Sequence, residues 1–390
     1  MSAGKPRVLF VLPAAVMGGA EIRLLNMLGA FSRIEPVLLA HRALPGIMER
    51  GQAAFFLDDY THWPDPNAFD RANVLRHARA VRAVAAQCRP DLAFGWLHHG
   101  AMFVRMAKWL GMRAATAGCL LGPPATYYRA RGVRLSCWER FMFRAIARWL
   151  DVLVTPSNGV RDELIAHFHG NPRRIRAIYN GVDLQRAQRR AAADDVAVPP
   201  KTRPRMVSAG RLGPDKGFAV LLEALARLAP QFDCELMLLG EGELRGQLEA
   251  RARELGVADR LLLPGHVENP FPYYASADVF AFASRFEGFG NVLVEAMALG
   301  LPMVSTACPY GPREIFAKAG SGLLTEVDNV DSTTQALARV LGEPELAAEL
   351  ARGARARAEE FSFARMCREY EDAILAALAG QAAGGAATSV

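Results

Sequence analysis

The densest group of chemically capable residues lies between positions 284 and 296. Two carboxylates, Glu287 and Glu295, stand eight positions apart in the string Ser-Arg-Phe-Glu-Gly-Phe-Gly-Asn-Val-Leu-Val-Glu-Ala, which follows an apolar strand and leads into a helix. Gly288 and Gly290 allow close backbone approach to a ligand. Asn291 is the expected N-cap, and the free N–H groups of the next turn would form an anion site. The pattern predicts that both carboxylates face one bound molecule, although either alone could be a solvated charge.

A second group of residues supplies positive charge. The string Gly-Arg-Leu-Gly-Pro-Asp-Lys-Gly directly follows another expected strand and places Arg211 and Lys216 five residues apart. Arginine can grip phosphate oxygens in a fork, whereas lysine acts as a point charge. Two exposed loop cations are the plain alternative. Because both stand in a strand-to-helix turn, the pattern favours a bound diphosphate.

Two further glycine turns are weaker signals. Gly240-Glu241-Gly242 is similar to a dinucleotide fingerprint, but Arg245 stands where the third small residue belongs, which disfavours a dinucleotide oxidoreductase. Gly18 and Gly19 precede Ala-Glu after the first expected strand and suit either backbone contact with phosphate or sugar or a plain tight turn. The sequence has no Asp-x-Asp, His-Glu-x-x-His, P-loop or Gly-x-Ser-x-Gly motif. We therefore expect no metal site.

The elements that must position these residues alternate between short apolar runs and helical patterns, which predicts βα units and parallel sheets. The expected strands are Arg7–Leu12, Pro36–Leu39, Asp91–Leu97, Ala114–Gly118, Val152–Thr155, Arg205–Gly210, Glu235–Leu239, Arg260–Leu263, Val279–Phe282 and Pro302–Ser305. The expected helices include Glu21–Phe31, Asn73–Gln87 and Trp138–Trp149.

The fold class predicted from this alternation is α/β, with two doubly wound Rossmann-like domains facing across a cleft. Ligands of such sheets bind beyond the carboxyl ends of the strands. Residues 185–204 are rich in Ala, Asp and Pro without periodicity, so we place a linker there, between an N-terminal domain over 1–184 and a C-terminal domain over 205–360. A helix is expected over 361–378 and a flexible tail over 379–390.

Composition and charge narrow the class of protein. The 390 residues are 51% hydrophobic and 22% charged, which excludes a disordered or disulfide-stapled chain. No apolar run approaches the roughly 18 residues needed to cross a bilayer, and six scattered cysteines without a Cys-x-x-Cys motif indicate reduced thiols and a cytoplasmic location. The net charge of +6 conceals a basic first half, since residues 1–200 carry 27 Lys and Arg against 15 Asp and Glu.

Three of these cations lie in one predicted amphipathic helix. Arg140, Arg144 and Arg148 follow Trp138 in a stretch whose single acid is Glu139. A basic helix that carries Trp and Phe is typical of a membrane-surface segment, and each cation near an anionic leaflet contributes about 1 kcal/mol. A core-facing helix with a solvated basic face fits equally well. We expect a peripheral contact with the inner face of the plasma membrane, and no nucleic-acid partner because no recognition motif occurs.

Four strings of the sequence resemble glycosyltransferase family 4, a family of retaining, sugar-nucleotide-dependent enzymes of the GT-B fold. They are the strings at 284–296 and 210–217, Gly-Gly-Ala-Glu at 18–21, and Tyr-Asn-Gly-Val-Asp at 179–183. The run Ser-Thr-Ala-Cys-Pro-Tyr-Gly-Pro-Arg-Glu-Ile at 305–315 is similar to bacterial members that build lipid-linked oligosaccharides, capsules or lipopolysaccharide. The resemblance implies transfer from a nucleotide-diphosphate sugar, most commonly a UDP-sugar, to a lipid-linked or cell-surface glycan acceptor. The alternatives are a soluble transferase of the same fold acting on a small acceptor, and a degenerate non-catalytic scaffold homologue.

The resemblance also implies roles for individual residues. Arg211 and Lys216 would bind the donor diphosphate, Glu287 would contact the donor sugar and stabilise the transition state, and Glu295 would hold the ribose hydroxyls. The other implied donor-binding residues are Gly18, Gly19, His266, Val267, Gly288, Phe289, Gly290, Asn291 and Val292. The resemblance makes residues 1–184 the acceptor-side domain and 205–360 the sugar-nucleotide-binding domain, and implies that the helix over 361–378 packs back on the N-terminal domain. No metal or other cofactor is implied, because the sugar nucleotide is a co-substrate.

One departure from the family pattern concerns the acceptor side. Several members have a His or Arg just after the strand that is expected to end at Gly118, whereas this chain has Cys119. His98 and His99, at the end of the preceding expected strand, are candidates to replace that residue. A structural role for both histidines is the alternative.

Overall fold

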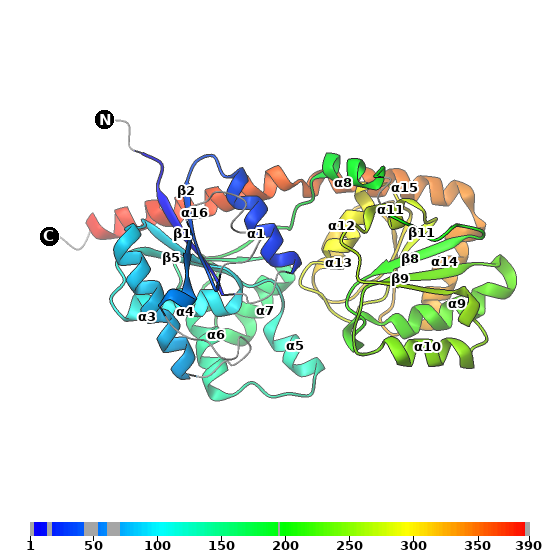
Figure 1. Ribbon diagram of the computed structural model, residues 1–390, viewed down its shortest axis with the longest axis horizontal. Helices are drawn as coiled ribbons and strands as arrows, with labels where there is room; N and C mark the ends of the chain where they lie inside the picture. Colours follow the sequence, from blue (N-terminus) through cyan, green and yellow to red (C-terminus); the bar gives the residue numbers. More distant parts are fainter. Residues whose placement is uncertain (1–3, 14–17, 43–53, 61–70, 194–195, 387–390) are drawn as a thin grey trace. The chain divides into compact units, whose positions relative to one another are not determined.

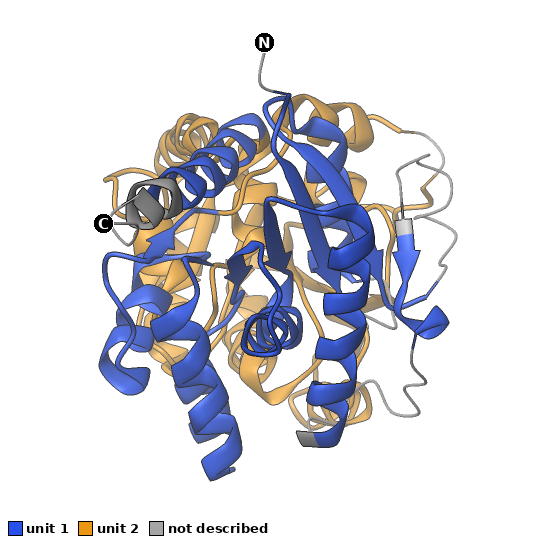
Figure 2. Ribbon diagram, turned by 90° about the vertical axis from the view of Figure 1, so that its left-hand side faces the viewer, with its two compact units in different colours: residues 1–179, 364–390 blue, residues 180–363 orange. Residues whose placement is uncertain are grey.

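The computed structural model describes residues 4–13, 18–42, 54–60, 71–193 and 196–386. These residues form two compact α/β units, each built around one parallel sheet (Figure 1, Figure 2). Unit 1 comprises the chain up to Tyr179 together with the residues from Ala364 onward, and unit 2 is Asn180–Phe363. The expected fold class of two doubly wound, Rossmann-like domains is confirmed.

Unit 1 contains a seven-stranded sheet in the order β3-β2-β1-β4-β5-β6-β7. Its strands are β1 Arg7–Leu12, β2 Glu35–Ala40, β3 Ala54–Phe56, β4 Leu92–Gly95, β5 Ala115–Cys119, β6 Val152–Thr155 and β7 Ile175–Ala177. Its helices are α1 Gly19–Ala30, α3 Arg71–Cys88, α4 Leu97–Trp109, α5 Pro124–Ala130, α6 Cys137–Trp149, α7 Asn158–Phe168 and α16 Phe363–Ala386.

Alternating side chains of the buried strands face the two helical layers of unit 1, as the two-residue period of a strand requires. Leu9, Val11 and Ala93 belong to a core shared with α3, α4 and α6. On the opposite face, the ring of Phe10 lies 5.4 Å from that of Phe94. The Phe94 ring in turn lies 5.9 Å from the ring of Tyr370 on α16. Both faces are covered, so the strands read as continuous apolar runs.

The C-terminal helix α16 (red in Figure 1) packs in unit 1 through buried polar contacts as well as rings. The Glu371 carboxylate accepts hydrogen bonds from the backbone N–H groups of Ser32 at 2.8 Å and Arg33 at 2.6 Å. The Arg33 guanidinium also donates to Glu371 at 3.2 Å and to Asp372 at 2.8 Å. Glu371 therefore holds the start of β2 against a helix more than 300 residues away in the sequence.

Unit 2 contains a six-stranded sheet in the order β10-β9-β8-β11-β12-β13. Its strands are β8 Arg205–Ala209, β9 Glu235–Leu239, β10 Leu261–Gly265, β11 Val279–Phe282, β12 Met303–Thr306 and β13 Leu323–Thr325. Its helices are α8 Leu184–Ala191, α9 Phe218–Phe232, α10 Arg245–Glu254, α11 Phe271–Ala275, α12 Asn291–Ala298, α13 Gly311–Ile315, α14 Val330–Gly342 and α15 Pro344–Ala358.

The expected linker over 185–204 is wrong in its first part, because α8 occupies residues 184–191. The Asp183 side chain caps α8 by accepting the Arg186 N–H at 2.9 Å. Arg190 donates to the Glu268 carbonyl at 2.9 Å, and its own carbonyl accepts from Asn269 at 2.9 Å. These contacts make α8 a part of unit 2. Ala187 is its one buried residue, so the helix has no apolar periodicity to detect.

Two other expected boundaries are also corrected. The strand expected over 91–97 ends at Gly95, and α4 begins at Leu97, whose positive φ of 62° turns the chain abruptly into the helix. The tail expected over 379–390 is helical as far as Ala386, where it continues α16; residues 387–390 lie outside the described part. The short strands β3, β7 and β13 were not predicted.

The contacts of α16 generate a prediction about stability. Glu371→Ala should lower the free energy of unfolding by about 3 kcal/mol, because it leaves two backbone N–H groups and Arg33 without their buried acceptor. Asp372→Ala is the matched control: it removes the other carboxylate partner of Arg33, which is 60% exposed, and should cost less than about 1 kcal/mol. Urea unfolding measures both variants, and equal losses would contradict the assignment.

Candidate active site

The candidate donor-binding residues of unit 2 gather where its sheet changes direction. From β8 the chain proceeds to β9 and β10 on one side, and then returns to place β11 on the other side of β8. The loops after β8 and β11 therefore leave neighbouring strands at the same carboxyl edge and diverge. Open α/β sheets bind their ligands at this switch point.

The two loops approach each other so closely that a glycine is required at position 217. Gly217 has a φ of +63°, and a Cβ atom added there would lie 2.1 Å from the carbonyl oxygen of Ala283. The N–H of Arg285 donates to the Asp215 carbonyl at 2.9 Å, which joins the loops through the backbone. This contact fixes the separation of the side chains that the loops carry.

Lys216 and Glu287 meet across the two loops. The Lys216 Nζ lies 2.6 Å from the Glu287 Oε1, and the same oxygen accepts a hydrogen bond from the Ser284 Oγ at 2.8 Å. The two side chains are only 19% and 14% exposed, so their attraction is less screened than that of a surface pair. The structure therefore brings together a cation and a carboxylate that the sequence analysis selected separately.

Arg211 stands beside this pair in the same loop. Its guanidinium Nη2 lies 2.7 Å from the Asp215 carboxylate and its Nη1 lies 3.8 Å from the carboxylate of Glu243, in the loop after β9. The Asp215 carboxylate lies 4.0 Å from Lys216 Nζ. Arg211 is about half exposed, so its remaining N–H groups are open to a ligand.

The helix α12 begins directly after the loop that carries Glu287. Gly290, at a φ of +97°, is the N-cap and Asn291 is the first helical residue, so the expected N-cap at Asn291 is wrong. The left-handed conformation at Gly290 makes the turn that a side-chain cap would otherwise stabilise. The Asn291 Oδ1 instead accepts a hydrogen bond from Asn180 at 2.9 Å. Val292 and Gly288 are partly exposed beside this helix end, and the Phe289 ring is buried.

The other predicted donor-binding residues lie along the same edge of the sheet. Glu295 is partly buried one turn into α12, and its charge, together with complete burial, raises the pKa of Tyr274 well above its usual range, burial being the larger cause. His266 is exposed and Val267 is partly buried in the loop after β10, which stands two strands from β8. The structure places His266 and Val267 on the same edge as Lys216 but gives no contact between them.

Sequence reasoning missed several residues that hold this arrangement. Ser284 and Asp215 bind the charged side chains directly, and both stood inside the quoted strings. Gly311, in the next loop, lies so close that a Cβ atom there would be 1.9 Å from the Phe289 carbonyl oxygen. Burial raises the pKa of Cys308 to about 12, with a contribution from Glu287. Gly311 and Cys308 belong to the quoted string at 305–315, but only the three-dimensional packing shows that they adjoin the loop of Glu287.

In unit 1, the predicted donor-binding residues Gly18 and Gly19 also lie at the switch point of the sheet, between β1 and β4. Gly18 caps α1, and its N–H donates to the Glu21 carboxylate at 2.9 Å; Gly19 is exposed as the first helical residue. The buried Trp96, after β4, donates from its indole N–H to the Ala20 carbonyl at 3.0 Å. Residues 14–17, which precede Gly18, lie outside the described part.

His98 and His99 occupy the first turn of α4 rather than a strand end. Their rings are 3.9 Å apart and line a pocket of about 410 Å³ with Tyr127 and Tyr128 among its walls. Burial lowers the pKa of His98 to about 4 and that of His99 to about 2, so both imidazoles are neutral at pH 7. The N–H of Leu97 donates to the Cys119 sulfur at 3.4 Å. The histidines therefore lie beside Cys119, the position at which this chain differs from the family pattern.

The helix α6 has the amphipathic form expected from its sequence. Arg140, Arg144 and Arg148 are exposed, whereas Trp138 packs partly buried against the core of unit 1. Phe141 is 43% exposed on the same helix, which leaves an aromatic side chain among the arginines. Within the part of the chain that the structure describes, no helix is long and apolar enough to cross a membrane. No three metal-binding side chains gather among the described residues either.

Two family models match consecutive parts of the chain: Glycosyltransferase Family 4 over residues 17–186, and Glycosyl transferases group 1 over residues 190–357. The N-acetylgalactosamine-N,N'-diacetylbacillosaminyl-diphospho-undecaprenol 4-alpha-N-acetylgalactosaminyltransferase of Campylobacter jejuni is 32% identical over 72% of this chain and 74% of its own length. The lipopolysaccharide core biosynthesis glycosyltransferase LpsE of Rhizobium meliloti is 35% identical over 47% of this chain and 52% of its own length.

Solved structures share the architecture at low sequence identity. The Anabaena protein HepE in complex with UDP superposes with a TM-score of 0.76 at 19% identity, over 95% of this chain and all of that chain. The sucrose-phosphate synthase of Thermosynechococcus elongatus gives a TM-score of 0.78 at 18% identity, over 96% of this chain and all of that chain. The family models and the Campylobacter relative show the family, and the superpositions show the fold: the chain belongs to glycosyltransferase family 4 and is a glycosyltransferase of the GT-B fold.

Proposed function

We propose that this glycosyltransferase moves a sugar, with retention of configuration, from a UDP-sugar to a lipid-linked or cell-surface glycan acceptor. The observation that carries the proposal is the contact of Lys216 with Glu287 at the switch point of unit 2. It places a cation suited to a diphosphate within 2.6 Å of a carboxylate suited to a sugar. A nucleotide-diphosphate sugar joins these two groups in one molecule.

The charges of the reaction match this arrangement. Cleavage of a sugar–phosphate bond builds negative charge on the departing diphosphate and positive charge on the anomeric carbon. Lys216, Arg211 and the free N–H groups at the start of α12 stabilise the first. Glu287 stabilises the second and holds the sugar hydroxyls, while Glu295, one turn into α12, binds the ribose hydroxyls.

Retention follows in this proposal from attack on the same face as the departing diphosphate, which takes the proton of the acceptor hydroxyl. No protein base or nucleophile is then needed. The thiol of Cys308 lies near Glu287, and its pKa of about 12 keeps it protonated. It therefore serves as neither base nor nucleophile at neutral pH.

The donor and acceptor classes are supported by the relatives. The name of the Campylobacter relative specifies an undecaprenol diphosphate acceptor, and LpsE is named for lipopolysaccharide core synthesis. HepE was solved with UDP and with UDP-glucose. For the acceptor side we propose the pocket that His98 and His99 line, where neutral imidazoles would hydrogen-bond acceptor hydroxyls. Gly18 and Gly19 would approach the donor diphosphate through their backbone.

A lipid-linked acceptor requires contact with a membrane, and we propose that α6 makes it. Its exposed Arg140, Arg144 and Arg148, with Trp138 and Phe141, suit the anionic inner face of the plasma membrane. The protein would then be a cytoplasmic enzyme attached peripherally.

The donor class is tested by thermal shift with UDP-, GDP- and ADP-sugars. UDP-sugars should raise the melting temperature, and Lys216→Ala should abolish that shift because the diphosphate loses its nearest cation. Arg253→Gln, at an exposed arginine in α10, is the control that should keep it. Stabilisation by GDP- or ADP-sugars alone would contradict the UDP assignment. Proton NMR of the product gives the anomeric configuration, and inversion would contradict retention.

The role of Glu287 gives a second prediction. Glu287→Gln should lower the transfer rate at least 100-fold, the usual order of loss for an electrostatic group aimed at the transition state, while UDP affinity changes less than about threefold. Glu345→Gln, at an exposed carboxylate in the first turn of α15, is the matched control and should retain activity. Steady-state transfer and UDP titration measure the two effects. Unchanged turnover in Glu287→Gln would remove Glu287 from the mechanism.

We also propose that transfer needs no metal ion, because Lys216, Arg211 and the start of α12 supply the positive charge that a diphosphate requires. Transfer in excess EDTA should stay within about twofold of the untreated rate. A loss of activity that Mg²⁺ or Mn²⁺ restores would contradict this proposal.

A further inference from the structure

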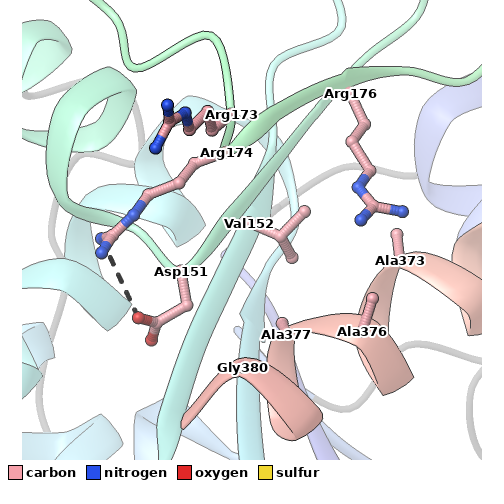
Figure 3. Close-up of a pocket in the computed structure, with 9 residues that line it drawn as sticks. All are labelled: Asp151, Val152, Arg173, Arg174, Arg176, Ala373, Ala376, Ala377 and Gly380. Carbon is pink, nitrogen blue, oxygen red and sulfur yellow. Dashed lines mark ion pairs between the residues drawn. The ribbon is translucent and has the colours of Figure 1, made fainter. Parts of the chain in front are cut away.

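Three arginines line a hollow in unit 1 that the proposed transfer reaction does not use. Arg173 and Arg174 precede β7 and Arg176 lies on it, and the hollow measures about 490 Å³ (Figure 3). The opposite wall is one face of α16, formed by Ala373, Ala376, Ala377 and Gly380. Of the described residues that line the hollow, Asp151 alone is acidic.

Positive charge exceeds negative charge in this hollow. The Asp151 Oδ2 already accepts hydrogen bonds from the Thr116 N–H at 2.8 Å and from its hydroxyl at 2.9 Å. The Oδ1 lies 4.0 Å from the Arg174 guanidinium, which is a weak contact. Arg173 and Arg176 are exposed and make no ion pair with any side chain in the described part of the chain. One carboxylate therefore faces three guanidinium groups.

The shape of the hollow leaves these guanidinium groups accessible. The residues of α16 that face it recur at spacings of three and four, so they lie on one stripe of the helix, and all are Ala or Gly. The Arg176 side chain extends toward this stripe above Ala373, while Arg173 and Arg174 lie on the other side of the hollow (Figure 3). Guanidinium forks match the oxygens of a phosphate group. Small residues on the facing helix keep room for that group.

The hollow lies at the edge of the unit 1 sheet opposite to the edge that carries His98 and Gly18. Asp151 and Val152 stand where β6 begins, and Arg173 to Arg176 where β7 begins, whereas His98 and Gly18 follow the carboxyl ends of β4 and β1. In a parallel sheet these are opposite edges. An anion bound between β7 and α16 would therefore occupy neither the donor nor the acceptor position proposed above.

Exposed tryptophans lie near the segment that Arg174 contacts, although none of the lining residues that the structure describes is aromatic. Arg174 donates to the Leu150 carbonyl at 3.4 Å, next to Trp149, which is 39% exposed. The Trp149 ring lies 5.8 Å from that of Trp109, over which the Arg105 guanidinium lies at 4.8 Å. Exposed tryptophans beside arginines are typical of the region where phospholipid headgroups meet acyl chains.

We propose that the hollow lined by Arg173, Arg174 and Arg176 binds a phosphate group. The phosphate comes either from a phospholipid headgroup, which the neighbouring tryptophans would accompany, or from a free phosphorylated molecule. Two or three guanidinium groups converge on it in either case, and the backbone of β7 and the facing turns of α16 become ordered around it.

Hydrogen–deuterium exchange of the full chain tests the proposal at the site itself. Inorganic pyrophosphate and, separately, phosphatidylglycerol vesicles are added, and protection is read in peptides that cover residues 171–180 and 371–380. Arg173→Gln with Arg176→Gln should weaken the apparent affinity for the probe at least tenfold. Arg189→Gln with Arg253→Gln removes the same charge from exposed helix positions in unit 2 and should leave that affinity unchanged.

Protection by both probes supports a site for phosphate in general, and protection by vesicles alone supports a lipid headgroup. Absence of protection in both peptides of the wild-type protein overturns the proposal, as does equal loss of affinity in the two double variants. Protection by pyrophosphate at residues 210–217 reports the donor site of unit 2 instead, so failure of that site and failure of this one are read separately.

Discussion

The donor-binding edge of unit 2 depends on how closely the loop after β8 approaches the loop after β11. Gly217 contacts Ala283 so tightly that no side chain fits between them, and the backbone of Asp215 and Arg285 joins the loops. Because the loops cannot separate, Lys216 stays within reach of Glu287, and both are partly shielded from water. The start of α12 belongs to the second loop, so the same approach also sets where its N–H groups lie. One backbone contact thus orders the charged groups of the site.

The interior strands could be predicted from the sequence because each is a continuous apolar run between polar turns. Val152–Thr155, Glu235–Leu239 and Val279–Phe282 match their predicted bounds residue for residue. Strands β3, β7 and β13 could not be found in this way, since each has three residues and joins the outer part of a sheet through one neighbour. Such strands form because the adjacent strand offers free backbone N–H and C=O groups. The hydrophobic pattern of the three residues themselves contains no sign of that neighbour.

Motif reasoning located the loops of the site but not the partners within it. The spacing of Lys216 and Glu287, 71 residues apart, carries no sign that they touch; the order of the strands creates the contact. The same holds for Asn180 and Asn291, whose side chains meet across 111 residues. The helix α8 escaped prediction for a related reason, because contacts with the loop after β10 hold it rather than an apolar face of its own.

The return of α16 to unit 1 has a consequence for biosynthesis. The strands of unit 1 leave the ribosome before unit 2, yet the ring that covers Phe94 and the carboxylate that satisfies Ser32 and Arg33 follow unit 2 in the sequence. All of unit 2 is synthesised in between. Unit 2 can therefore complete its core while one face of the unit 1 sheet is still uncovered and the N–H groups of Ser32 and Arg33 still lack their acceptor. Domains usually complete folding in the order of their synthesis. Here unit 1 begins to fold before unit 2 but completes its core after it.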